Sequence, residues 1–172
     1  MSDLSLTDIR HLEAAQGWLG LHNWREAKAE IDNIAEGLLS HPDVLQVSWA
    51  IHAAAKEWEL AARVADAHRQ ARPDSPFGFV HLAYALHEMR RTEEAQNVLL
   101  LVVDKFKDEY IIRYNLACYA CQLGDQEAAW RWLEKSMALT DSDEVKRMAL
   151  NDPDLGPMRE RINERWPKES EE

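Results

Sequence analysis

Four alanine residues recur along the chain at a constant interval of 34 residues: Ala27, Ala61, Ala95 and Ala129. The same interval separates several other pairs of like residues, namely Trp24 and Trp58, Leu82 and Leu116, Ala83 and Ala117, and Leu99 and Leu133. A fixed period of this length is typical of stacked helix–turn–helix units. The repeat therefore predicts an all-α chain in which each unit buries its apolar face against the next.

The period divides the chain into four units and a C-terminal segment. The units run over 8–41, 42–75, 76–109 and 110–143, followed by a capping segment at 144–166 and a frayed, charged tail at 167–172. First helices are expected at 9–21, 43–55, 77–89 and 111–123, and second helices near 25–37, 59–71, 93–105 and 127–139. Pro42 and Pro76 open two of the units, and none of the six prolines falls inside an expected repeat helix. Because proline is tolerated at the start of a helix but not in its interior, this division of the chain is consistent.

The turns expected between paired helices carry residues that end or begin helices. Asn23 with Glu26 reads as a capping box, and Thr92 and Asp125 can cap the second helices of units three and four. Gly124 suits the left-handed conformation that ends a first helix. The place of this glycine is taken in the first three units by His22, Lys56 and Arg90.

The units resemble the tetratricopeptide-repeat (TPR) family over residues 8–143. Unit four carries the resemblance most fully, in the segments 114–124, 125–129 and 132–136, and unit three follows with Leu82, Ala83, Leu86, Thr92–Ala95 and Leu99. Trp49 departs from the pattern, because the family prefers a small residue at its position. The resemblance implies one domain, a right-handed superhelix of four repeats. It also implies that the chain is a non-catalytic protein-interaction scaffold.

The segment after the repeats is expected to cover the apolar face of the last unit. Residues 143–150 predict a helix with Asp143 or Ser142 as its N-cap, residues 151–157 break it, and residues 157–166 predict a final short helix. The ending Ala-Leu-x-Asp-Pro-Asp-Leu at 149–155 is similar to the close of several bacterial TPR proteins.

The family resemblance also implies a binding surface, since the first helices of a TPR stack line its concave face. In units three and four the positions that face this groove are aromatic or weakly polar and almost uncharged. They are Phe77, Val80, His81, Tyr84, His87, Glu88, Ile111, Tyr114, Asn115, Cys118, Cys121 and Gln122. Aromatic side chains beside a few hydrogen-bonding groups are typical of peptide-binding surfaces, so the expected partner is a peptide or helix of another protein.

Charge and composition exclude several other classes of partner. The formal net charge of −11 is spread along the chain and disfavours binding to nucleic acid or to an anionic membrane, both of which require clustered Lys and Arg. Two cysteines are too few for a disulfide scaffold, and no secretory signal or membrane-spanning apolar run is evident. The expected location is therefore the cytoplasm.

Catalysis is not indicated, because the sequence has no nucleophile elbow, phosphate-binding glycine loop or His-Glu-x-x-His motif. No cofactor is expected.

Three alternatives to the peptide-binding scaffold remain open. One is a bacterial secretion-type chaperone. Another is a metal- or thiol-dependent role at Cys118, Cys121, His81 and His87, since thiolate and imidazole are the ligands that zinc prefers. The third is a self-associating structural module, a homodimer formed through the half of the chain that contains Trp49.

Overall fold

The computed structural model describes residues 3–166, and within that range the chain is all-helical, with no strands. The tail at 167–172, predicted to be frayed, lies outside the described residues. The chain divides into two compact units, with a boundary between Arg91 and Thr92, and each compact unit contains helices of more than one of the 34-residue repeats. Unit one contains α1 (Leu6–Gly20), α2 (Trp24–Ile31), the 3-10 helix η1 (Glu36–Leu38), α3 (Pro42–Ala54), α4 (Trp58–Ala71) and α5 (Phe77–Glu88). Unit two contains α6 (Thr92–Leu100), α7 (Tyr110–Gln122), α8 (Gln126–Met137), α9 (Ser142–Asn151), η2 (Pro153–Met158) and α10 (Arg159–Arg165).

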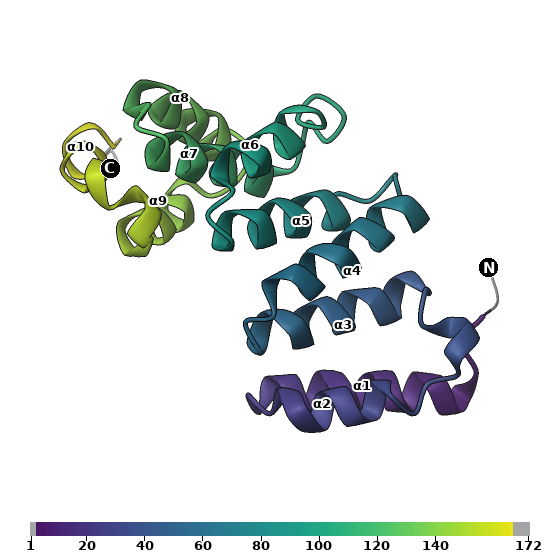
Figure 1. Ribbon diagram of the computed structural model, residues 1–172. Helices are drawn as coiled ribbons and strands as arrows, with labels where there is room; N and C mark the ends of the chain where they lie inside the picture. The colour runs from purple at the N-terminus through teal and green to yellow at the C-terminus, as the bar shows by residue number, and fades with distance from the viewer. Residues whose placement is uncertain (1–2, 167–172) are drawn as a thin grey trace. The chain divides into compact units, whose positions relative to one another are not determined.

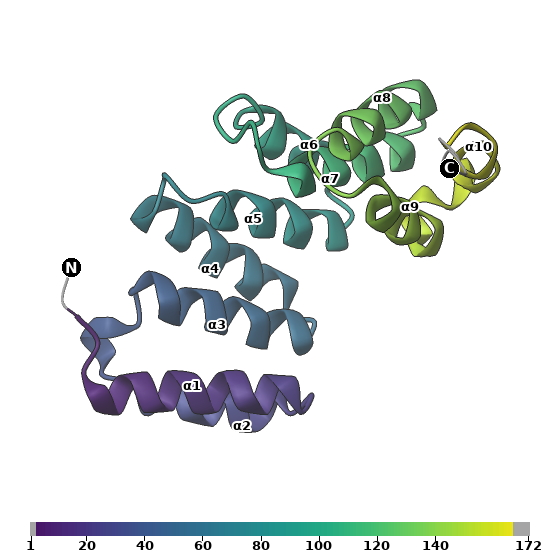
Figure 2. The same cartoon turned by 180° about the vertical axis from the view of Figure 1, so that it is seen from behind.

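Unit one is built from helical hairpins. Helices α1 and α2 pack against each other, as do α3 and α4, and α5 packs closely on α4 (Figures 1 and 2). The predicted small residues of the second helices, Ala27 and Ala61, are completely buried. Around them lies an apolar cluster drawn from α1 to α3, made of Leu12, Ala15, Ala27, Ile31, Ile34, Val44, Val47 and Ile51. The 34-residue period therefore marks the helix-to-helix contacts of this unit.

Unit two repeats the hairpin with α7 and α8, and the capping segment then returns to it (Figure 1). The segment η2 packs on α7, while α9 and α10 pack on each other and on η2. Leu155, Met158 and Ile162 are completely buried. The segment 144–166, predicted to cap the repeats, thus buries apolar side chains completely.

The turns that end the four first helices have one backbone geometry. His22, Lys56, Arg90 and Gly124, spaced at 34 residues, all have positive φ angles, of 58°, 58°, 64° and 88°. In each turn the following N–H donates to the carbonyl five residues earlier at 2.9 Å, as Asn23 does to Trp18. This is the bond that closes a helix ending in the left-handed region. The left-handed conformation predicted for Gly124 is confirmed, and the three non-glycine residues adopt it as well.

Two second helices are shorter than the repeat predicts. Helix α2 ends at Ile31 rather than near 37, because the Ala35 N–H donates to the Asp8 carboxylate of α1 at 3.2 Å instead of to a helical carbonyl. Helix α6 ends at Leu100 rather than near 105. There the Arg113 guanidinium of α7 binds the backbone carbonyls of Val103, Phe106 and Glu109, at 3.3, 3.1 and 3.2 Å.

The predicted caps are partly correct. Asn23 accepts a hydrogen bond from the Glu26 N–H at 3.4 Å, and Asp125 accepts one from the Ala128 N–H at 2.8 Å. The N-cap of α9 is Asp141, not Ser142 or Asp143 as predicted. The Asp141 carboxylate accepts from the backbone N–H groups of both Asp143 and Glu144, because it stands one residue before the first helical residue.

Candidate functional site

A cluster of aromatic and imidazole rings joins α3, α4 and α5 in unit one. We call it the α5 ring cluster, and it consists of Trp49, Trp58, His68, Phe77, His81 and Tyr84. The His81 imidazole stacks on Phe77 with 3.8 Å between ring centroids, and Trp49 meets His81 edge-on at 4.2 Å. Trp49 therefore fills, with a large ring, the position at which a small residue was expected.

Tyr84 is the exposed member of the α5 ring cluster. Its side chain packs edge-on against Trp49 and Trp58, with centroid distances of 6.1 and 5.8 Å, and the residue remains 40% exposed. A half-exposed tyrosine held between two tryptophans offers a rigid apolar surface with a hydroxyl at its tip. Such residues lose little conformational entropy when they bind.

The other α5 residues predicted to face a groove are less accessible. Phe77 and His81 are half-buried, Val80 and His87 are buried, and Glu88 is exposed. The His81 imidazole donates from Nδ1 to the Phe77 carbonyl oxygen at 2.8 Å. Burial lowers the pKa of His81, and the nearby His68 lowers it further. The hydrogen bond to the Phe77 carbonyl opposes this shift, so the net effect favours the neutral imidazole, which packs as a ring.

On α7, the predicted groove residues are in contact with the chain's own capping segment. The Tyr114 hydroxyl donates to the Asp152 carboxylate at 2.9 Å, and the Cys118 thiol donates to the same carboxylate oxygen at 3.5 Å. The Gln122 amide donates to the Asp154 carbonyl at 2.8 Å. Tyr114, Cys118 and Cys121 are each about nine-tenths or more buried. We call residues 152–156 the capping turn, since they lie over this face of α7.

The two remaining α7 candidates stay partly accessible. Ile111 and Asn115 are half-buried, and they lie toward the start of the helix, where neither has a hydrogen bond to the capping turn. Asp152 and Asp154 were not predicted as partners of the groove residues. The signal in the sequence was the Asp-Pro-Asp-Leu run followed by Met158, since Leu155 and Met158 need an apolar face to cover.

The two cysteines are free thiols with suppressed acidity. Burial raises the pKa of Cys118, as do the carboxylates of Asp152 and Asp154, and the same causes raise the pKa of Cys121. A thiol is nucleophilic and binds metal as the thiolate. Within residues 3–166, no three His, Cys, Asp or Glu side chains are grouped so that they could hold a metal ion. Burial thus disfavours the thiolate form of both cysteines.

Comparison with known proteins identifies the fold class. No protein-family model matches the sequence, and no curated protein matches it. Solved structures of MamA are similar in fold. A MamA RS-1 double mutant is 18% identical, with a TM-score of 0.67, 84% of this chain covered and 78% of that one. MamA AMB-1 is 17% identical, with a TM-score of 0.61 and coverages of 78% and 72%. MamA from Desulfovibrio magneticus RS-1, from residue 41 to its end, is 16% identical, with a TM-score of 0.50 and coverages of 80% and 97%.

At these identities the likeness concerns the fold alone, and the fold class predicted from the 34-residue period is confirmed: the chain is an all-α, TPR-like helical-repeat protein. None of the helices in the described part of the chain is long and apolar enough to cross a bilayer.

Proposed function

We propose that the chain is a non-catalytic, TPR-type scaffold that binds a peptide or helix of a partner protein along its first helices. The observation that carries this proposal is the α5 ring cluster, with Tyr84 held half-exposed between Trp49 and Trp58. Rigid aromatic side chains at a partly desolvated surface dominate the affinity of many protein interfaces. The all-α repeat fold supports the proposal, because helical repeats present extended surfaces built from equivalent helices.

The contacts on α7 refine which residues a partner would touch. Tyr114, Cys118 and Cys121 are covered by the capping turn, so a partner could reach them only by displacing Asp152 and its neighbours. Phe77, His81 and Tyr84 on α5, and Ile111 and Asn115 on α7, remain as contacts of an undisplaced chain. We place the strongest contribution at Tyr84. The cytoplasm remains the location proposed for this binding.

The proposal is tested by comparing the proteins that wild type and Tyr84→Ala retain from a native extract, identified by mass spectrometry. Truncating a central aromatic contact typically weakens binding by about 2 kcal/mol or more, which is roughly thirtyfold, so we expect the partner to be lost. Leu21→Ala is the matched control, because Leu21 is 71% exposed but lies outside the α5 ring cluster. A partner retained equally by all three proteins would show that Tyr84 is not the contact.

A further inference from the structure

A hollow with a volume of about 300 Å³ opens between α3 and α4 in unit one. Its lining consists of Leu45, His52, Leu60, Arg63, Val64 and Ala67, none of which belongs to the α5 ring cluster or to the predicted groove. Four of the six residues are aliphatic. An apolar cavity of about 150 Å³ is already large enough to hold a benzene ring. The hollow therefore has room for a large aliphatic side chain from outside.

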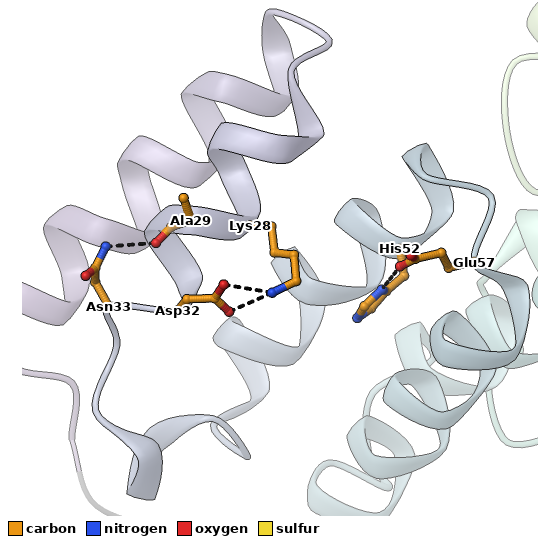
Figure 3. A network of polar contacts seen from close by, with 6 residues as sticks. All are labelled: Lys28, Ala29, Asp32, Asn33, His52 and Glu57. Carbon is orange, nitrogen blue, oxygen red and sulfur yellow. Dashed lines mark hydrogen bonds and ion pairs between the residues drawn. The ribbon is translucent and has the colours of Figure 1, made fainter.

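The rim of the hollow carries a cation with no partner in its own chain. Arg63 is exposed and forms no hydrogen bond, ion pair or ring contact with any residue in the described range 3–166. His52 is the other polar residue of the lining. It pairs with Glu57 at 2.7 Å, so the Glu57 carboxylate is already engaged (Figure 3). In a chain with a net charge of −11, an unpaired arginine beside an apolar hollow favours an occupant that has a carboxylate next to an aliphatic side chain.

The chain itself displays such a pair in unit two. Leu101, directly after α6, is 85% exposed, and its neighbour Leu100 is 43% exposed. Asp104 lies three residues further along the same helical turn, is also exposed, and forms no hydrogen bond or ion pair within the described residues. We call residues 101–104 the leucine turn. A leucine this exposed gains substantially from burial against another apolar surface.

We propose that the leucine turn of one copy docks into the α3–α4 hollow of a second copy. Leu101 then covers the aliphatic lining, and Asp104 pairs with Arg63. Each copy carries both the leucine turn and the hollow, so the contact is heterologous, and repeating it from copy to copy builds open chains or closed rings. The contact is small, and we expect transient association with a dissociation constant in the range of about 10 µM to 1 mM. This self-assembly goes beyond the binding of a partner peptide proposed above.

The proposal is tested by sedimentation velocity over roughly 10 µM to 1 mM protein. Wild type is expected to form a growing series of species. Leu101→Ser and Arg63→Glu are each expected to weaken association about ten- to hundredfold, because one removes the aliphatic contact and the other reverses the charge at the rim. Leu21→Ser is the control, since it removes another strongly exposed leucine, 71% exposed against 85% for Leu101, and it should associate like wild type. The side chains changed in these tests are all exposed, namely Leu21, Arg63, Leu101 and Asp104, and circular dichroism verifies that the variants fold.

Mixing the two defective variants gives the sharpest test. Leu101→Ser retains an intact hollow and Arg63→Glu retains an intact leucine turn, so an equimolar mixture can form one interface and should stop at a dimer. The double variant Arg63→Glu/Asp104→Arg should recover the series of larger species, because the ion pair is restored with its charges exchanged. Wild type that stays monomeric throughout overturns the proposal. So does association that Leu101→Ser leaves unchanged, which would mean that the copies associate through another surface.

Discussion

At the residue scale, the repeated turns contain a backbone conformation that three of their four side chains do not favour. Gly124 adopts positive φ without steric cost, whereas His22, Lys56 and Arg90 bring a Cβ atom close to the following carbonyl oxygen. The hydrogen bond that closes each turn is the same, at 2.9 Å in all four. The surrounding hairpins therefore hold the three non-glycine turns in place.

Lys56→Gly is accordingly expected to raise the free energy of unfolding by about 1 kcal/mol, since glycine relieves the left-handed strain. The reciprocal change, Gly124→Ala, should lower it by a similar amount. A Cβ atom built at Gly124 has no neighbour within 4 Å, so the cost there comes from the backbone alone. Urea denaturation followed by circular dichroism measures both. A neutral Lys56→Gly beside a destabilising Gly124→Ala would show that the strain at Lys56 is compensated by contacts of its side chain.

The buried histidines of unit one predict a dependence of stability on pH. His68 is fully buried, its Nε2 lies 3.3 Å from the Gln46 amide nitrogen, and its Nδ1 has no partner within the described residues. Burial lowers the pKa of His68, with the Arg72 charge contributing and Asp43 opposing, and burial also lowers the pKa of His81. The folded state thus binds fewer protons than the unfolded state, whose histidines titrate near 6.5. Stability is fully present above that pH and is lost below it.

We therefore expect wild type to lose unfolding free energy between pH 7.5 and 5.5, by at most about 1.4 kcal/mol per pH unit for each histidine. His68→Gln cannot take up a proton and should reduce this slope. The measurement is a series of urea unfolding curves at fixed ionic strength. His22→Gln is the control, since His22 lies in an exposed turn. Equal slopes for the two variants would show that the pKa of His68 is the same in the folded and unfolded states.

At the scale of the helices, Gly78 sets the distance between α4 and α5. A Cβ atom at this position would lie 2.5 Å from the backbone nitrogen of Arg69, which no side-chain movement can relieve. Gly78→Ala should therefore force α5 away from α4 and cost about 1–3 kcal/mol, although alanine favours the helix intrinsically. Gly17→Ala in α1 is the matched control. Its Cβ meets nothing within 4 Å, so it should stabilise the protein by up to about 1 kcal/mol. Thermal unfolding compares the two, and a stabilised Gly78→Ala would contradict the close approach.

The elements also show how far the sequence leads. The 34-residue period located the hairpins α1–α2, α3–α4 and α7–α8. Its small residues Ala27, Ala61, Ala95 and Ala129 are all fully buried. The early ends of α2 and α6 could not be predicted, since they depend on Asp8 and Arg113 of other helices capturing backbone groups. The candidate site was likewise predicted only in part. Tyr84 is exposed as expected for a contact residue, but the cover over Tyr114 comes from Asp152, 38 residues further along the chain.

At the scale of the whole molecule, the chain has two compact units, and each contains tryptophan residues that report on its own folding. Unit one contains Trp18, Trp24, Trp49 and Trp58, and unit two contains Trp130, Trp132 and Trp166. The cap is attached to its own unit through charge as well as apolar burial, since the Arg161 guanidinium binds the Glu127 carboxylate at 2.6 and 3.1 Å. Neighbouring repeats stabilise each other through their interfaces, so a unit that loses its cap should lose its own order first.

A chain ending at Thr140 tests this expectation. It lacks Leu155, Met158 and Ile162, which are completely buried, and it leaves Tyr114, Cys118 and Gln122 on α7 without the capping turn. In nitrogen-15 NMR spectra, the indole signals of Trp130 and Trp132 should collapse toward unfolded positions, while those of Trp18, Trp24, Trp49 and Trp58 stay dispersed. Arg161→Gln in the full chain is the milder control, since an exposed ion pair contributes about 1 kcal/mol or less. Simultaneous collapse of all six indoles would mean that the two units fold as one. Six unchanged signals would mean that α7 and α8 are stable without the cap, and that the capping turn is available for displacement by a partner.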